Sequence, residues 1–239
     1  MTDFIFLNSH PEAGKDTLAN EIMKWDFTNK VGNAKIVTPL VFHEKFAAHL
    51  THVLIAIYNL YDLGDQGLRY LEENKSNPTH KYLDRLMGRT WREAKIHTSE
   101  SVLKPAYGEA YFGDIIATKI LAGVYDHYDY VVFSDSGFSF ELNPVVKAIA
   151  DPSKIHVVKF DRNIDGEQMY DDTHFYYFDN QGVKKKDSRY FVNIDEVNNG
   201  VEDKFKLSEE RNVQRIGITE YETPAITASR ILNWIWSKK

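Results

Sequence analysis

The segment from residue 4 to residue 19, FIFLNSHPEAGKDTLA, constrains the fold more than any other part of the chain. It opens with four apolar residues and continues into turn residues, which is typical of a short buried strand. A helix is predicted from Asp16 to about Trp25. A strand that runs through a turn into a helix places Gly14 and Lys15 at the helix N-terminus. Backbone N–H groups and a lysine at such a terminus are suited to binding phosphate.

The composition predicts a globular protein with a sizeable core. Of the 239 residues, 43% are hydrophobic and 13% are aromatic, which argues against extended disorder. No apolar run approaches the roughly 20 residues of a membrane-spanning helix, and no signal-peptide pattern opens the chain. The absence of cysteine excludes disulfides, thiolate nucleophiles and cysteine-bound metals. We therefore expect a cytoplasmic protein without a membrane partner. Its net charge of −6 disfavours non-specific coating of nucleic acid but leaves room for a local basic groove.

Short apolar runs and helical periodicities alternate along the rest of the chain. Residues 128–136 and 154–160 predict strands, a further strand is expected within 33–39, and residues 174–184 predict a hairpin. Helices are expected at residues 16–25, 42–61, 78–87, 90–104, 113–126 and 222–239. This alternation indicates an α/β domain with a mainly parallel sheet.

The turn after the first strand differs from the usual phosphate-binding loop, G-x-x-x-x-G-K-[ST], at two positions. Ser9 stands at the first glycine, and Asp16, followed by Thr17, stands at the Ser/Thr position. The residues alone fit either a phosphate-binding loop or an ordinary connection in which Asp16 caps the helix. Its place directly after a buried strand favours phosphate binding, because ligands of parallel sheets bind at the carboxyl ends of the strands.

The sequence GKDTLA after an N-terminal strand resembles the Gly-Lys-Asp-Thr loop of phage-type P-loop nucleotide kinases. These include deoxynucleoside monophosphate kinases and 5-hydroxymethyluracil DNA kinases, and the opening LNSHPEAGKDT is closer to the DNA-kinase branch. Residues 91–114, 128–142 and 187–200 are also similar to segments of this family. The resemblance implies one P-loop kinase domain over residues 1–239. Its expected fold is a three-layer αβα arrangement around a mainly parallel sheet, with a lid insertion at about 161–189.

The resemblance also implies the cofactors ATP and Mg²⁺. Lys15 would bridge the β- and γ-phosphates, while the N–H groups of Ala13, Gly14, Lys15 and Asp16 would cradle them. Either Thr17 or Asp16 would face Mg²⁺, since both side chains offer an oxygen ligand.

A second group of candidate residues follows the strand that ends near residue 134. Asp135 is suited to act as a general base or to hold Mg²⁺ through water, and the alternative is that it caps a turn. Glu141 fits a site carboxylate and a solvated residue of a helix's first turn equally well. Phe138 and Phe140 could stack on a base, although aromatic side chains more often belong to the core.

Basic residues gather in two parts of the chain. Residues 81–95 carry five basic side chains against two acidic ones, which could hold acceptor phosphates or a DNA backbone, or form a solvated helix face. The resemblance places Arg92 beside the acceptor. Arg162 and Arg189 flank a polar segment, and the resemblance implies a lid that closes over the γ-phosphate with an arginine, for which Arg189 is the candidate.

Three hypotheses about function follow. The first is a kinase for the hydroxymethyl group of 5-hydroxymethyl-deoxyuridine in phage DNA, acting in the host cytoplasm if the gene is phage-encoded. The second is a deoxynucleoside monophosphate kinase, and the third is a nucleotide-binding protein without catalysis. Monophosphate kinases of this type carry an arginine two residues after the aspartate of the second turn. Gly137 stands at that position after Asp135, which favours a neutral hydroxymethyl acceptor.

Overall fold

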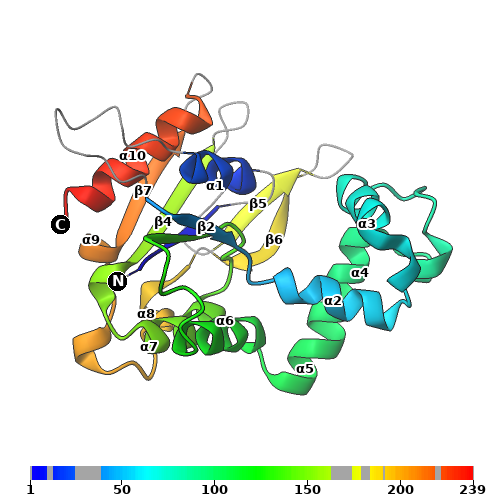
Figure 1. Ribbon diagram of the computed structural model, residues 1–239, viewed down its shortest axis with the longest axis horizontal. Coiled ribbons are helices and arrows are strands. Elements are labelled where there is room, and N and C mark those ends of the chain that lie inside the picture. Colours follow the sequence, from blue (N-terminus) through cyan, green and yellow to red (C-terminus); the bar gives the residue numbers. More distant parts are fainter. Residues whose placement is uncertain are drawn as a thin grey trace. The chain divides into compact units, whose positions relative to one another are not determined.

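A central sheet of five parallel strands organises the chain in the computed structural model, which describes residues 2–9, 13–24, 39–162, 174–178, 184–190, 192–218 and 222–238. Its strands are β1 (Asp3–Asn8), β2 (Val41–Glu44), β3 (Tyr130–Phe133), β4 (Ile155–Arg162) and β7 (Val213–Ile218). They lie in the order β2-β3-β1-β4-β7, and every pairing is parallel (Figure 1). The central strand β1 is buried over its whole length, as its continuous apolar run predicts.

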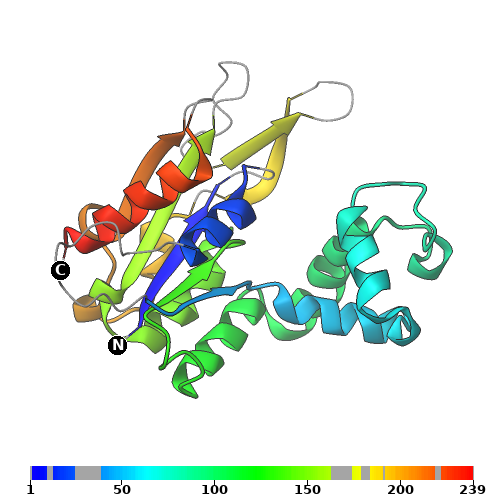
Figure 2. The same cartoon turned by 45° about the horizontal axis from the view of Figure 1, so that its top comes forward.

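Helices cover both faces of this sheet, which confirms the predicted three-layer α/β fold. On one face, α1 (Lys15–Met23) packs beside α10 (Pro224–Trp236) (Figures 1 and 2). Buried residues of both helices share a core cluster with Ile5 and Leu7 of β1. The other face is covered by α6 (Tyr111–Leu121), α7 (Ser139–Ile149) and α8 (Ile194–Val197). A short α9 (Glu209–Asn212) precedes β7. Successive side chains of β1 point to opposite faces of the sheet and therefore pack into two different apolar layers.

Two further strands form a separate antiparallel hairpin. They are β5 (His174–Phe178) and β6 (Lys184–Tyr190). The expected hairpin at residues 174–184 is present, but its second strand begins at Lys184 and extends to Tyr190, and the turn expected at residues 180–182 lies outside the described residues. The remaining residues of the expected lid, 163–173 and 179–183, lie outside the described part of the chain.

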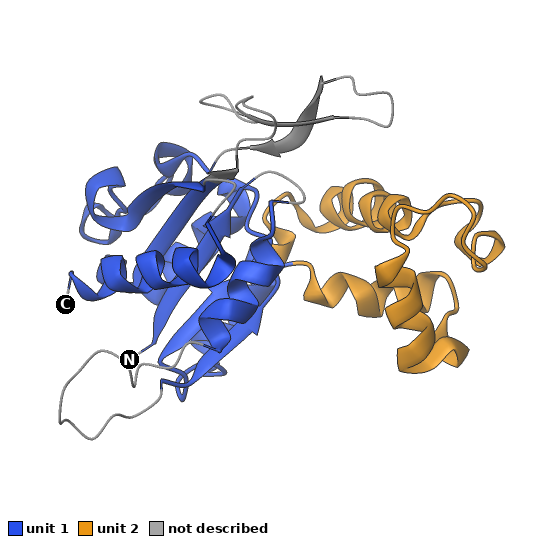
Figure 3. Cartoon of the chain, turned by 90° about the horizontal axis from the view of Figure 1, so that it is seen from above, with its two compact units in different colours: residues 1–46, 113–239 blue, residues 47–112 orange. Residues whose placement is uncertain are grey.

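The chain divides into two compact units (Figure 3). Unit 1 comprises residues 1–46 and 113–239 and contains the parallel sheet, whereas unit 2 comprises residues 47–112 and is helical. The helices of unit 2 are α2 (Ala48–Ile57), α3 (Gly64–Glu73), α4 (Trp91–His97), a π-helix (Thr98–Leu103) and α5 (Lys104–Tyr107). Thr90 caps α4 through a reciprocal capping box with Glu93, as the sequence predicts. Buried Leu54, Leu71 and Trp91 supply part of the core of this unit.

Several predicted elements of residues 42–107 are wrong. Residues 42–44 belong to β2 and not to a helix, because they pair with β3. Residues 78–87 contain only a 3₁₀ turn at Asp84–Leu86, and α3 was not expected. The helix that starts after Thr90 continues past Pro105, because this proline lies in the first turn of α5, where a missing N–H costs little. The strand expected within 33–39 falls almost entirely outside the described residues.

The contact between α6 and α7 yields a stability prediction. A Cβ atom added to Gly113 would lie 1.9 Å from the backbone oxygen of Glu141, so the two helices would have to separate. We expect Gly113→Ala to lower the free energy of unfolding by about 3 kcal/mol, the upper range for overpacking. In the matched control Gly217→Ala, the new methyl group meets nothing within 4 Å. Thermal unfolding should separate the two variants, and equal melting temperatures would contradict the close packing.

Candidate functional site

The turn between β1 and α1 ends in a glycine with a left-handed backbone. Gly14 is the N-cap of α1 and has φ of 86°, a conformation that favours glycine. The first backbone hydrogen bond of α1 runs from Leu18 to the Gly14 carbonyl (2.9 Å), so the N–H groups of the first turn point out of the helix end. Asp16 lies inside this first turn. Its interpretation as the N-cap is therefore wrong.

Lys15 is the first residue of α1, and its side chain reaches back to Ser9, the residue after β1. Its Nζ atom donates a hydrogen bond to the carbonyl oxygen of Ser9 at 2.8 Å. Ser9 and Ala13 are buried, and Lys15 is half-buried. The ammonium group is thus held beside the backbone of the turn, at the N-terminal end of α1.

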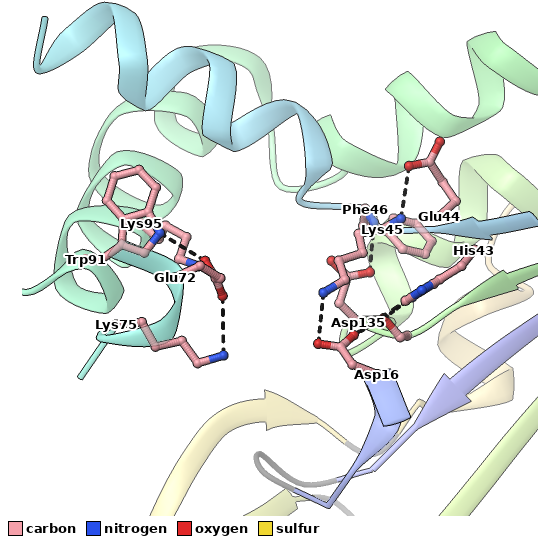
Figure 4. Close-up of polar contacts among 11 residues, drawn as sticks. Asp16, His43, Glu44, Lys45, Phe46, Glu72, Lys75, Trp91, Lys95 and Asp135 are labelled. Atoms are coloured by element: carbon pink, nitrogen blue, oxygen red, sulfur yellow. Dashed lines mark hydrogen bonds and ion pairs between the residues drawn. The ribbon is translucent and has the colours of Figure 1, made fainter. Parts of the chain in front are cut away.

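Asp16 belongs to a group of four side chains from three elements, which we call the Asp16 network: Asp16, His43, Lys45 and Ser134 (Figure 4). Ser134, the residue after β3, donates a hydrogen bond from Oγ to Asp16 Oδ1 at 2.5 Å. His43 of β2 has its Nε2 atom 2.7 Å from the same Oγ. Because a hydroxyl has one proton to donate, His43 is the donor to Ser134 and carries a proton on Nε2.

Charge in the Asp16 network is balanced by Lys45. Its Nζ atom lies 2.9 Å from Asp16 Oδ2. Burial alone would raise the pKa of Asp16, but hydrogen bonds from Ser134 and Lys45 and the Lys45 charge outweigh it, so this pKa lies below its ordinary value. Burial and the Lys45 charge lower the pKa of His43, and the nearby carboxylates offset this only in part. Near neutral pH, the network therefore combines an ionised carboxylate with a neutral imidazole.

Glu44 explains why His43 and Lys45 face Asp16. Its carboxylate is buried and accepts hydrogen bonds from Lys119 Nζ (2.8 Å) and the Tyr125 hydroxyl (3.0 Å). Alternate residues of an extended strand point to opposite sides. Anchoring Glu44 on one side therefore directs its two neighbours to the other.

Asp135 and Asn8 tie the two strand ends together. Asp135 is half-buried, and its Oδ1 atom accepts the backbone N–H of Phe46 at 2.8 Å. Buried Asn8 donates from Nδ2 to the Ser136 carbonyl (3.0 Å), and its Oδ1 accepts the N–H of Val192 (3.1 Å). The bond from Phe46 thus orients the Asp135 carboxylate, and the bond from Asn8 joins the residue after Asp135 to the end of β1.

The structure places the other candidates of unit 1 as follows. Thr17 is exposed on α1. Glu141 is only 5% exposed, so its interpretation as a solvated carboxylate is wrong. Phe138 and Phe140 are half-buried and stack on each other with ring centroids 5.1 Å apart. The side chains of Arg162 in β4 and Arg189 in β6 lie outside the described part of the structure.

In unit 2, the Glu72 carboxylate contacts two lysine side chains. Its Oε2 atom accepts hydrogen bonds from Lys95 Nζ (2.6 Å) and Trp91 Nε1 (3.0 Å), and its Oε1 lies 3.4 Å from Lys75 Nζ (Figure 4). Burial alone would raise the pKa of Glu72, but these hydrogen bonds and charges outweigh it and lower the pKa. Lys75 and Lys95 are therefore held by a carboxylate of their own unit.

The remaining basic residues of 81–95 are held in different ways. Arg85 forms an ion pair with Asp62 (2.7 Å), and Lys81 lies over the rings of Tyr70 and Tyr82, 4.6 and 4.9 Å from their centroids. Arg92 is half-buried on α4, and its backbone N–H bonds the Lys75 carbonyl at 2.8 Å. The structure thus places Arg92 in unit 2, whereas Lys15 and Asp135 belong to unit 1.

The Asp16 network offers ligands suited to Mg²⁺. The Asp16 carboxylate is 54% exposed, and Mg²⁺ in nucleotide sites is commonly bound through one or two carboxylates together with phosphates and water. Within the described residues, no group of three or more His, Asp or Glu is arranged to hold a metal by itself. The donors fit a cation that arrives with phosphate better than a metal held by protein alone.

Sequence reasoning missed three members of the network, namely His43, Lys45 and Ser134. The first two lie in or next to a segment that was expected to be helical. Their spacing of two residues becomes a signal only when residues 41–44 are treated as a strand. Ser134 could have been found from its place near the carboxyl end of a predicted strand.

Glu72 yields a stability prediction for unit 2. We expect Glu72→Gln to lower the free energy of unfolding by about 1 kcal/mol near pH 7, because a half-exposed ion pair is partly screened. A lowered folded-state pKa contributes stability above the unfolded value of about 4.3, and this is lost as pH falls through the folded value. The difference in melting temperature should therefore shrink on acidification. Glu73→Gln, a neighbouring exposed carboxylate, is the control, and an identical loss there would contradict the specific role of Glu72.

No protein-family model and no curated protein sequence matches the chain. In the described residues, no helix is long and apolar enough to cross a membrane. The candidate site therefore consists of Lys15 and the first turn of α1, the Asp16 network and Asp135.

Proposed function

We propose that this protein is an ATP-dependent kinase that transfers the γ-phosphoryl group to a nucleoside-type acceptor, foremost the hydroxymethyl group of 5-hydroxymethyl-deoxyuridine in DNA. The observation that supports the proposal is the link between two turns at the carboxyl edge of the sheet. The turn after β1 presents Lys15 at a helix N-terminus, and the turn after β3 reaches Asp16 through Ser134. Ligands of parallel sheets bind at this edge.

In this proposal, Lys15 and the first-turn N–H groups of α1 hold the β- and γ-phosphates of ATP. Mg²⁺, when bound, neutralises phosphate charge as the transferred group leaves. Asp16 is the side chain best placed to contact that cation, since its carboxylate is partly exposed and ionised. Lys15 needs little reorientation, because it is already held beside the turn by the Ser9 carbonyl.

Asp135 is the proposed general base. The acceptor hydroxyl oxygen forms a bond to the γ-phosphorus, the bond from that phosphorus to the β–γ bridging oxygen breaks, and ADP leaves. The hydroxyl proton passes to the Asp135 carboxylate, whose orientation is fixed by the N–H of Phe46. A base held in this way costs less to position than a mobile one.

The class of acceptor is inferred from Gly137, which lies two residues after Asp135. Glycine offers no guanidinium for a terminal phosphate dianion, whereas a neutral hydroxymethyl group needs none. A deoxynucleoside monophosphate is the alternative acceptor, and Arg92 of unit 2 is the residue that could bind its phosphate.

The decisive experiment follows the label of γ-³²P-ATP offered with hydroxymethyluracil DNA, plain DNA and a panel of deoxynucleoside monophosphates. We expect label in hydroxymethyluracil DNA in preference to any mononucleotide. Labelled diphosphates with unlabelled DNA would favour the monophosphate kinase instead. ATP binding without transfer to any acceptor would favour a non-catalytic nucleotide-binding protein.

Lys15→Met should reduce this transfer by about 100-fold or more, because it removes the cation that stabilises charge on the phosphates. The matched control is Lys24→Met at the end of the same helix, whose lysine is exposed and contacts only Glu21 in the contacts described. Both variants should melt like the wild type. Near-normal transfer by a folded Lys15→Met protein would contradict phosphate binding at this turn.

A further inference from the structure

The hydrogen bond between Asp16 and Ser134 reverses a familiar pairing. In P-loop NTPases, a Ser or Thr that follows the loop lysine binds Mg²⁺, and an aspartate of a neighbouring strand supports the cation. Here the residue that follows Lys15 is the carboxylate Asp16, and the residue that follows the neighbouring strand β3 is the hydroxyl Ser134. The two groups remain hydrogen-bonded to each other, at 2.5 Å.

The surroundings of both residues fit this reversed arrangement. Ser134 is 2% exposed, and its single proton is committed to Asp16, because an ionised carboxylate can only accept a hydrogen bond. Asp16 is 54% exposed, and its second oxygen faces Lys45. The hydroxyl is thus on the buried side of the pair, where it can only orient its partner, and the carboxylate is on the exposed side, where it can take up a ligand.

We propose that the carboxylate and the hydroxyl of the cation-binding pair are exchanged between their two elements, so that Asp16 binds the divalent cation that accompanies a nucleoside triphosphate and Ser134 is its positioning residue. This inference rests on the proposed nucleotide site, and it selects Asp16 over Thr17 as the ligand. A bound carboxylate brings one more negative charge to the cation than a hydroxyl does.

Lys45 determines when Asp16 can bind the divalent cation. Its ammonium already neutralises Asp16 at 2.9 Å, so a dication alone gains little by replacing it. A cation that arrives with triphosphate oxygens gains those ligands as well, and the displaced ammonium can pair with the phosphates. The site should therefore bind the cation together with the nucleotide and only weakly without it.

The test is Mn²⁺ binding to the protein, measured with and without ATP as the excess of Mn²⁺ on the protein side of an equilibrium dialysis membrane, so that Mn²⁺ held by free ATP cancels. The wild type should take up Mn²⁺ in the presence of ATP. Asp16→Asn, which keeps the shape of an exposed side chain, should weaken this uptake by about 10- to 100-fold, whereas Thr17→Ala should leave it within about twofold. Glu21→Gln, which removes a half-buried carboxylate from the same helix, is the charge-matched control.

Exchange of the two groups provides a sharper test. Asp16→Ser alone should lose Mn²⁺ uptake, and the double variant Asp16→Ser/Ser134→Asp should regain most of it, because it restores the usual order of hydroxyl and carboxylate. Thermal unfolding shows whether the buried Ser134→Asp change is tolerated. If the double variant does not fold, the Mn²⁺ uptake of Asp16→Asn compared with that of Thr17→Ala decides which residue is the cation ligand.

The outcomes separate this inference from the proposed function. Loss of uptake in Thr17→Ala with normal uptake in Asp16→Asn would overturn the exchange, even in an active kinase. So would a folded double variant that is no better than Asp16→Ser. Mn²⁺ uptake that depends on ATP and on Asp16, but without transfer to any acceptor, would support the exchange and reject the kinase. Absence of ATP-dependent uptake in the wild type would overturn both.

Discussion

The parallel pairing of β1 with β3 is the constraint on which the rest of the site depends. The pairing of Phe6 with Phe133 makes the two strands end nearly level, so the turns that follow them meet at one edge of the sheet. The side chain of Asn8 then donates to the Ser136 carbonyl and the hydroxyl of Ser136 donates to the Leu7 carbonyl, which cross-links the two strand ends. The Asp16–Ser134 hydrogen bond spans the same edge. A shift of the register would separate all of these partners together.

The third strand of this edge, β2, contributes charge. Because β2 pairs with β3, the two side chains that point away from Glu44 reach the same carboxylate that Ser134 orients. Lys45 supplies the positive charge and His43 supplies a fixed proton donor. A partly buried aspartate could otherwise gain a proton as burial raised its pKa, but this network keeps Asp16 ionised. An ionised carboxylate is the form that a divalent cation needs.

The parts of the site that could be predicted are those contained in one short stretch of sequence. The β1–α1 turn is such a stretch, and its strand, glycine and lysine were found from local pattern alone. The Asp16–Ser134 contact joins residues 118 positions apart, and no local pattern encodes it. Strand β2 was missed because its four residues include His43 and Glu44, polar residues that weaken a strand signal. Glu141 lies in the first turn of α7, where a carboxylate is commonly exposed to solvent, but the fold buries its side chain.

Unit 2 shows why a row of charges in a sequence is a poor guide to a charged surface. Residues 47–112 contain eight basic and eight acidic side chains, and the structure pairs Arg85 with Asp62 and joins Lys75 and Lys95 to Glu72. A phosphate that approached these cations would compete with a carboxylate already in place. Electrostatic attraction of a DNA backbone by this unit is therefore weaker than the five cations of residues 81–95 suggest. In the proposed kinase, recognition of the acceptor would therefore depend more on unit 1, which carries Asp135, than on the charge of unit 2.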